Sequence, residues 1–366
     1  MKPSFSYPEL ISLIDDRKVA VAVSGGADSL LSMVLLKELG ADVMAVHGCF
    51  MGVEKSKKAV AGLEVRCAEL GIDLHVFDFT AEFNKMVIDP FVKDYLDGNT
   101  PNPCAQCNPQ IKFGVLYESV RKLGAEALST GHYVRIASHE KYGMMIARGA
   151  EIGKDQSYFL SLVPKEKVLN AVFPLGNHSK SETYSELERR GLRIPLPTES
   201  QEICFVPDDD YRPFLMGRNI KLPGAGNVVL STGEKIGHHQ GLWRYTHGQR
   251  KGLGIAWKEP LYVIEKNLEQ NLLVLGTKEE LGAFGCIAEK VNFLVDFEKW
   301  PETVHIQTRY RQRSMPAKVR LDGDNLVFEF VEKHSIPTPG QIVAAYTDDG
   351  AVLGGGIIRN ALLEGK

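Results

Sequence analysis

Short apolar runs alternate with stretches of helical periodicity over about the first 200 residues of the chain. The apolar runs have the length and composition of buried strands, and the stretches between them have the spacing of amphipathic helices. The predicted strands cover residues 19–23, 43–46, 74–77 and 126–130, and the predicted helices cover residues 30–39, 111–123 and 181–190. Ser179 or Ser181 is a candidate N-cap for the last helix, and Gly191 ends it. This alternation predicts an α/β domain with a parallel, doubly wound sheet.

Beyond Cys204 the chain changes to short strands separated by turn-forming residues. Turns at residues 223–227, 232–234 and 248–252 predict a small β-rich module that ends near Gly276. From Val291 to Ile358, apolar and polar residues alternate between Asp-Gly and Pro-Gly turns, which predicts a closing β-barrel. We therefore expect three domains, which cover residues 1–207, 208–285 and 286–366.

The composition is typical of a globular protein with more than one domain. The chain has 366 residues, of which 44% are hydrophobic, and this exceeds what one hydrophobic core usually supports. Since no apolar segment is long enough to cross a membrane and no leader-like segment begins the chain, we expect a cytoplasmic protein without a membrane partner. A net charge of −3 argues against unspecific coating of nucleic acid, although it permits a local basic patch.

The segment from Ser24 to Ser29, with the sequence SGGADS, connects the first predicted strand to the helix that follows. Two glycines allow a tight turn close to a ligand, and the first N–H groups of a helix attract an anion. The Gly-Lys-Ser/Thr ending of the common P-loop is missing, so simple hydrolysis of a γ-phosphate is not expected. A plain Gly-Gly turn is the alternative. The hydroxyls at both ends and Asp28 between them favour a phosphate site.

Cys104 and Cys107 lie three positions apart in a proline-rich loop just before a predicted helix. Their sulfurs can converge on one point, and we expect the helix start and nearby Lys112 to lower the pKa of these thiols. Reactive thiols or metal ligands fit this loop better than inert thiols, although the second cysteine pair of a four-cysteine zinc site is missing. Cys204 lies between two apolar residues, a setting more typical of a core. We expect Cys49, Cys67 and Cys286 to be packing residues.

Taken in order, these motifs resemble those of the bacterial tRNA-specific 2-thiouridylases, a family of the ATP pyrophosphatase superfamily, over nearly the whole chain. The matching segments are residues 24–29, 100–113, 130–133, 154–160, 203–205, 237–241, 248–255, 309–312 and 339–341. The resemblance implies an N-terminal domain of the adenine nucleotide alpha hydrolase type, followed by the two β-rich modules. It also implies that residues 24–29 hold the pyrophosphate end of ATP while an oxygen attacks the α-phosphate.

In that family, ATP with Mg²⁺ activates O2 of uridine 34 at the wobble position of tRNA, and sulfur then replaces it with release of AMP and pyrophosphate. The resemblance implies that Cys204 carries the incoming persulfide and that Cys107 frees the product by forming a disulfide with Cys204. Thiolates suit both steps because they are strong nucleophiles. The residues implied to bind the nucleotide are Ala22, Val23, Ser24, Gly25, Gly26, Ala27, Asp28, Ser29, Met51 and Gly131.

The resemblance further implies contacts with the wobble-uridine tRNAs for Lys, Glu and Gln and with a sulfur-donor protein, either a cysteine desulfurase or a relay carrier. The target base has to leave the anticodon stack to be reached. The residues in tRNA-facing positions are Asn102, Pro103, Cys104, His132, Lys154, Asp155, Gln156, Arg309, Tyr310 and Gln341. From spacing alone, Arg309 and Tyr310 could equally bind RNA or belong to an exposed face of a strand. His238 and His239 would point to opposite faces of a strand, so we do not expect them to share a metal.

Three features depart from the family pattern. Cys104 stands where many members have an aspartate proposed as a general base, and Cys104, Cys107 and Cys204 could instead hold a [4Fe–4S] cluster that delivers sulfide. The segment after Met51 is shorter and less acidic than usual, which would change contacts with partners there. Glu202 stands where the family usually has glycine, which removes backbone freedom beside the thiol.

Two other kinds of function share part of this pattern. An ATP pyrophosphatase that forms an amide or argininosuccinate would use the same ATP chemistry but has no need of a paired thiol system. A tRNA-binding or iron–sulfur protein without turnover would have no need of an adenylating loop. The phosphate loop together with the three cysteines therefore favours sulfur transfer to tRNA.

Overall fold

The computed structural model describes residues 5–196 and 203–363. Its N-terminal part is built on a five-stranded parallel sheet in the order β4-β3-β2-β5-β8. The strands are β2 (Lys18–Ala22), β3 (Asp42–Cys49), β4 (Leu74–Asp78), β5 (Ala127–Ser129) and β8 (Ala171–Val172). The strand order reverses at β2, since β3 and β4 extend the sheet on one side and β5 and β8 on the other. Doubly wound sheets bind ligands at the carboxyl ends of the strands next to such a reversal.

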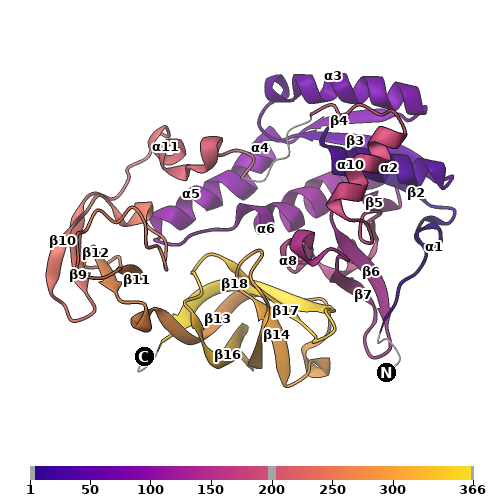
Figure 1. Ribbon diagram of the computed structural model, residues 1–366. Helices are drawn as coiled ribbons and strands as arrows, with labels where there is room; N and C mark the ends of the chain where they lie inside the picture. The colour runs from indigo at the N-terminus through magenta and orange to yellow at the C-terminus, as the bar shows by residue number, and fades with distance from the viewer. Residues whose placement is uncertain (1–4, 197–202, 364–366) are drawn as a thin grey trace.

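Both faces of this sheet are covered (Figure 1). Val19 and Val21 of β2 pack in a cluster with side chains of α2 (Ala27–Glu38) and α3 (Val53–Leu70), whereas Ala20 packs on the other face with Phe113. The three central side chains of β2 are fully buried, which explains why this part of the sequence is one continuous apolar run. The remaining helices of this part are α1 (Leu10–Ile14), α4 (Thr80–Phe83), α5 (Asp89–Leu96), α6 (Pro103–Cys107), α7 (Tyr117–Lys122), α8 (Ser157–Leu160), α9 (Lys165–Leu169) and α10 (Lys180–Arg189).

A smaller sheet extends the N-terminal part toward the barrel. It contains β1 (Phe5–Ser6), β6 (Val134–His139) and β7 (Gly143–Arg148) in the order β1-β6-β7. Helix α11 (Tyr211–Met216) then leads to a four-stranded sheet of β9 (Gly226–Leu230), β10 (Lys235–His239), β11 (Tyr262–Asn267) and β12 (Leu272–Gly276). This four-stranded sheet forms the β-rich module predicted after Cys204.

The C-terminal part is a closed barrel with the strand order β13-β16-β15-β14-β17-β18. Its strands are β13 (Gly282–Phe293), β14 (Thr303–Gln307), β15 (Met315–Asp322), β16 (Asn325–Ser335), β17 (Ile342–Tyr346) and β18 (Val352–Leu362). In Figure 1 the barrel lies below the N-terminal part, with the module of β9–β12 at its left. No helix in the described part of the chain is both long and apolar enough to cross a lipid bilayer.

The predicted architecture is confirmed, but two element boundaries are wrong. The helix predicted over residues 111–123 begins earlier, as α6, and continues through a π-helical segment from Asn108 to Leu116 before α7. Gly114 interrupts it with φ −101° and ψ −109°, so a simple 3.6-residue period does not describe this stretch. The first barrel strand begins at Gly282, well before the predicted start, because register shifts between Ala283 and Asn292 break the alternation.

Candidate active site

The turn between β2 and α2 forms a cradle of hydroxyl and backbone groups. Gly25 has a φ of +90°, a left-handed conformation that favours glycine. The Ser29 hydroxyl accepts a hydrogen bond from the backbone N–H of Ser24 at 3.1 Å. Helix α2 begins at Ala27 without a side-chain cap, so its first N–H groups can bind an anion. The turn therefore has the geometry that the sequence predicts for a phosphate loop.

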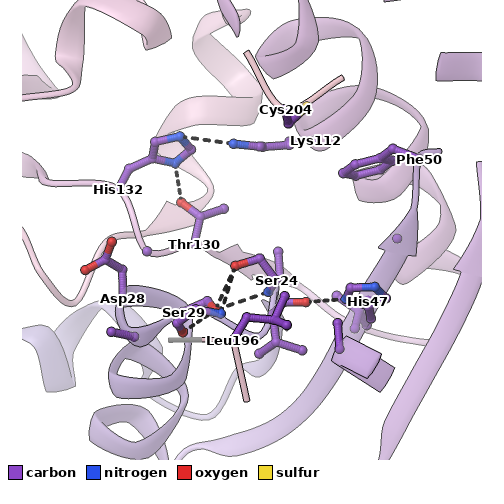
Figure 2. A pocket seen from close by; sticks show the side chains of 18 of the residues that line it. Ser24, Asp28, Ser29, His47, Phe50, Lys112, Thr130, His132, Leu196 and Cys204 are labelled. Atoms are coloured by element: carbon purple, nitrogen blue, oxygen red, sulfur yellow. Dashed lines mark hydrogen bonds between the residues drawn. The ribbon is translucent and has the colours of Figure 1, made fainter. Parts of the chain in front are cut away.

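This loop forms one wall of a cavity of about 490 Å³ (Figure 2). Nine of the ten residues predicted to bind the nucleotide line the cavity, and Gly25 is the exception. Gly131 approaches the start of α2 so closely that a Cβ atom there would lie 2.9 Å from atoms of Asp28 and Ser29. The short segment after Met51 turns directly into α3, whose Lys55 and Ser56 also line the cavity. The volume lies in the usual range of small-molecule and cofactor sites.

Lys180, the first residue of α10, reaches back to the phosphate loop. Its ammonium donates hydrogen bonds of 2.8 Å to both carboxylate oxygens of Asp28, which also accepts one of 2.7 Å from the Tyr133 hydroxyl. A capping box at Ser179 holds the start of α10. Sequence reasoning missed Lys180, because the cap signal at Ser179 locates a helix but not the contacts of its first side chain.

Lys112 also reaches into the cavity, below Cys204 in the view of Figure 2, and points toward His132. Its Nζ lies 3.4 Å from Nε2 of His132, and the Thr130 hydroxyl lies 2.7 Å from Nδ1. Burial, reinforced by the charge of Lys112, lowers the pKa of His132 well below its usual value. Because an ammonium can only donate, Nε2 accepts from Lys112 and the Nδ1–H donates to Thr130. His132 is therefore neutral and fixed in one tautomer.

The three cysteines of the site come from two segments. Cys104 and Cys107 lie on α6, a helix of five residues that Asn102 caps by accepting a hydrogen bond of 3.1 Å from the N–H of Ala105. Cys204 lies on the loop before α11 and lines the cavity. Solvent reaches Cys104 and Cys204, whereas Cys107 is half-buried. Cys49, Cys67 and Cys286 are buried, as predicted.

The protein around these thiols makes them weaker acids. Burial raises the pKa of Cys107 to about 12, that of Cys204 to about 11, and that of Cys104 as well, although the last two side chains touch solvent. The charge of Lys112 lowers all three pKa values but does not outweigh burial. The expectation that Lys112 and the helix start would leave the thiols more acidic is therefore wrong. Charge on Cys204 or Cys104 raises the pKa of Cys107, so the three thiols are close enough to interact electrostatically.

These thiols are not arranged as a metal site. Within residues 5–196 and 203–363, no group of three or more His, Cys, Asp or Glu side chains could hold a metal ion. The described arrangement therefore does not fit a cluster at Cys104, Cys107 and Cys204. His238 is exposed and His239 is buried, so the adjacent pair points to opposite faces of β10, as predicted.

The positions implied to face tRNA fall into two groups, and the first surrounds the cavity. His132 and Gln156 line it, and Lys154 ends the short helical turn that precedes Gln156. Asp155 is buried, and its carboxylate accepts hydrogen bonds from Arg148 at 2.9 Å and from the hydroxyl of Ser157 at 2.8 Å. The charge of Asp155 is thus satisfied inside the protein.

The second group lies where the barrel meets the cysteine loop. Arg309 donates a hydrogen bond of 2.6 Å to the Thr338 hydroxyl, and the ring of Tyr310 lies 4.5 Å from that of Phe159. Gln341 contacts the loop that contains Asn102, and Pro103 begins α6. The structure therefore brings barrel residues to the segment that carries Cys104 and Cys107. Glu202 lies outside the described residues.

Three family models match the chain in succession. They are described as a tRNA methyl transferase HUP domain over residues 17–208, a tRNA methyl transferase PRC-barrel domain over residues 214–277 and an aminomethyltransferase beta-barrel domain over residues 284–358. The matches extend over all three parts of the fold.

Several curated relatives match nearly the whole chain. A protein named tRNA-specific 2-thiouridylase MnmA from Nitratidesulfovibrio vulgaris (strain DSM 19637 / Miyazaki F) is 49% identical over 93% of this chain and 99% of its own length. Proteins of the same name from Lawsonia intracellularis and Geobacter metallireducens are 44% and 40% identical over 94% and 95% of this chain, and the matches cover 99% and 98% of their own lengths. A solved structure, the U34-tRNA thiolase NcsA from Methanococcus maripaludis with its [4Fe–4S] cluster, matches with a TM-score of 0.35 and 19% identity over 50% of this chain and 59% of its own.

Proposed function

Because this chain belongs to the family of the tRNA-specific 2-thiouridylases, we propose that it uses ATP to exchange O2 of a tRNA uridine for sulfur. The observation that carries the proposal is that the phosphate loop and Cys204 line one cavity. A nucleotide on the loop and a base brought to Cys204 would therefore meet in the same space. Both lie in the domain that we propose to span residues 1–207, ahead of domains over residues 208–285 and 286–366.

The first step is adenylation of the uridine, because a carbonyl oxygen leaves poorly until it is esterified. Residues 24–29 and the start of α2 would bind the phosphates, with Met51 and Gly131 at the rest of the nucleotide. Lys180 lies beside this loop and can donate to phosphate oxygens as it now donates to Asp28.

A site for Mg²⁺ is available in the same place. Asp28 is the one acidic side chain among the described residues that line the cavity, and Mg²⁺ is often held by one or two carboxylates together with substrate phosphates. Asp28 would therefore hold the ion together with the phosphates of ATP. When bound, Mg²⁺ offsets negative charge on the departing pyrophosphate.

In the second step, sulfur displaces AMP. We assign the persulfide to Cys204, whose terminal sulfur attacks C2 of the uridine while the bond from C2 to the adenylated oxygen breaks. Cys107 then attacks Sγ of Cys204, which breaks the S–S bond, leaves the sulfur on the base and forms a Cys107–Cys204 disulfide. Lys112 supports the attack by Cys107, because its charge lowers the pKa of that thiol.

A [4Fe–4S] cluster at Cys104, Cys107 and Cys204 is a second candidate for sulfur delivery. The observation that favours it is the mutual electrostatic effect of the three thiols. The present arrangement does not fit a cluster, so we derive no step through it. Iron and sulfide content after anaerobic purification decides between the two routes, since iron-free protein that retains thiolation activity with a persulfide donor would exclude the cluster.

We propose the wobble-uridine tRNAs for Lys, Glu and Gln as substrates, a cysteine desulfurase or a relay carrier as the sulfur donor, and the cytoplasm as the location. Among the positions implied to face tRNA, we favour those at the cavity, since the base has to enter it. His132 and Gln156 line the cavity, and we keep with them Lys154, two residues before Gln156, and the start of α6 with Asn102, Pro103 and Cys104. Asp155 and Arg309 are held by internal contacts and would act by supporting their neighbours.

Other functions fit the cavity less well. A pyrophosphatase with a nitrogen acceptor would not need Cys204 on the cavity wall, and a binding protein without turnover would not need the phosphate loop beside it. The proposal is tested by mass spectrometry of tRNA nucleosides from a strain that lacks this enzyme class, with and without the chain. Restoration of 2-thiouridine at position 34 is expected, and an unchanged nucleoside profile would contradict the proposal.

A further inference from the structure

A turn of the C-terminal barrel is hydrogen-bonded to the loop that leads into α6, the helix that carries Cys104 and Cys107. The side-chain amide of Gln341 donates hydrogen bonds to the backbone carbonyls of Thr100 at 2.8 Å and Pro101 at 3.2 Å. The side-chain carbonyl oxygen of Gln341 accepts a hydrogen bond of 3.5 Å from the side-chain amide of Asn102. A glutamine amide has two N–H donors, and both are used here. The N–H donors of Gln341 therefore serve the loop, and its carbonyl oxygen keeps one acceptor lone pair.

The backbone of the same turn adds further contacts. The N–H of Thr100 donates a hydrogen bond of 2.9 Å to the carbonyl of Pro339. Gly340 has a φ of +89°, and a Cβ atom there would lie 2.9 Å from Cβ of Asn99 and 3.0 Å from the backbone of Thr100. The turn and the loop are thus in direct contact, with no room for a side chain between them.

The central module holds the loop from a second side. The Thr100 hydroxyl lies 3.1 Å from that of Thr246, within hydrogen-bond distance. Arg309 of the barrel donates to the carbonyl of His247 at 3.3 Å and to the Thr338 hydroxyl, so it ties the module to the barrel next to this loop. All three parts of the fold therefore meet at Thr100.

The loop is connected to the thiols by a very short path. Asn102, which contacts Gln341, is the N-cap of α6, and Cys104 is the second residue of that helix. Cys107 is its fifth and last residue. The place of the first turn therefore bears directly on Cys104, and Cys107 lies one turn further along, just before the helix continues into the segment from Asn108 to Leu116.

We propose that Gln341 is a positioning residue through which the C-terminal barrel sets the place of Cys104 and Cys107. It acts through the backbone of Thr100 and Pro101 and through Asn102. The effect of Gln341 on catalysis rests on the proposed function. Its effect on the place of the thiols does not, since that is measurable without tRNA. A barrel that docks tRNA would also be able to adjust the thiols through the same contacts.

The test uses Gln341→Glu in the full chain, because this change keeps the shape of the side chain but removes both donors and sets a carboxylate against two carbonyls. The matched control is Asn360→Asp, an exposed amide on β18 of the same barrel that undergoes the same change of charge. Iodoacetamide labelling of Cys104 and Cys107 is followed by peptide mass spectrometry without ATP or tRNA. We expect Cys107 to react at least about threefold faster in Gln341→Glu, because the loop and the first turn of its helix are released, and at the wild-type rate in Asn360→Asp.

Two further measurements separate positioning from RNA contact. Single-turnover thiolation should fall by about 10- to 100-fold in Gln341→Glu, while the affinity for tRNA matches that of Asn360→Asp. If Gln341→Glu does not fold, Gly340→Ala serves instead, since its added methyl group pushes on Thr100 from the same side. Unchanged labelling in a folded variant, or weakened tRNA binding with unchanged labelling, would overturn the proposal. Absence of 2-thiouridine with the wild-type chain would contradict the proposed function and leave the labelling result intact.

Discussion

Nζ of Lys180 lies 2.8 Å from both carboxylate oxygens of Asp28, so a cation from α10 rests on the phosphate loop at the start of α2. The two residues are 152 positions apart in the chain, and only 11% of the Lys180 side chain is exposed. The pair neutralises itself in a cavity that otherwise carries the positive charges of Lys55 and Lys112. Phosphates and Mg²⁺ would supply each member with a stronger partner, because phosphate attracts the ammonium and Mg²⁺ attracts the carboxylate.

Lys180→Met should weaken the binding of ATP and of pyrophosphate by about 10- to 100-fold, the range that the loss of a charge-assisted hydrogen bond produces. The binding of AMP should change much less, because the affected phosphates are absent. Isothermal titration with the three ligands measures the difference. Lys37→Met, at the exposed far end of α2, is the control. Equal losses for AMP and pyrophosphate would mean that Lys180 only supports the fold.

Gly131→Ala should raise the KM for ATP by about tenfold, because overpacking of this kind typically costs 1–3 kcal/mol. The added methyl group would lie 2.9 Å from the backbone of Asp28 and Ser29 and would displace the start of α2. Steady-state measurement of AMP release gives the KM. Gly124→Ala tests the specificity of the effect, since a Cβ atom at Gly124 would meet nothing within 4 Å, although its φ of +86° adds some strain. A wild-type KM in Gly131→Ala would contradict the close approach.

The reaction of Cys204 with iodoacetamide should rise with pH up to about 11, since burial raises the pKa of this thiol and only the thiolate reacts. Lys112→Met should shift this profile to higher pH, because the charge of Lys112 lowers the pKa of Cys204. The labelling rate at pH 8 should therefore fall in the variant. Lys122→Met, an exposed change on α7, should leave the profile in place. A shift to lower pH in Lys112→Met would contradict the assigned role.

Phe328→Ala should destabilise the barrel by about 3–5 kcal/mol, because this fully buried ring would leave a cavity in the core. Trp300 packs in the same cluster and reports the transition by its fluorescence. Val331→Ala on the same strand, where 58% of the side chain is exposed, should change stability by less than about 0.5 kcal/mol. Equal free energies of unfolding for the two variants would contradict the placement of Phe328 in the core.

The sequence predicted those features that depend on neighbouring residues. The phosphate loop could be recognised because Gly25, Gly26 and the start of α2 are contiguous, and the paired thiols because Cys104 and Cys107 share one short helix. The strands of the parallel sheet could be predicted for the same reason, since a continuous apolar run such as that of β2 indicates a buried strand. Features of this kind are encoded in a window of a few residues.

Contacts between distant segments could not be predicted in this way. Neither Lys180 on Asp28 nor Gln341 on Thr100 has a local signal, because the fold alone brings these segments together. The acidity of the thiols was predicted with the wrong sign for a related reason. The charge of Lys112 can be seen in the sequence, but the burial that outweighs it depends on packing around Cys107 and Cys204.

The central claim is that ATP bound at the phosphate loop and sulfur carried by Cys204 act on one uridine in one cavity. A single-turnover reaction with ATP, a persulfide donor and unmodified tRNA tests it most directly, with Cys204→Ser beside the wild-type chain and mass spectrometry of the tRNA nucleosides as the readout. The wild type should form 2-thiouridine at position 34. Cys204→Ser should form none, while an adenylated tRNA intermediate accumulates because the phosphate loop is intact. Formation of 2-thiouridine by Cys204→Ser would contradict the account.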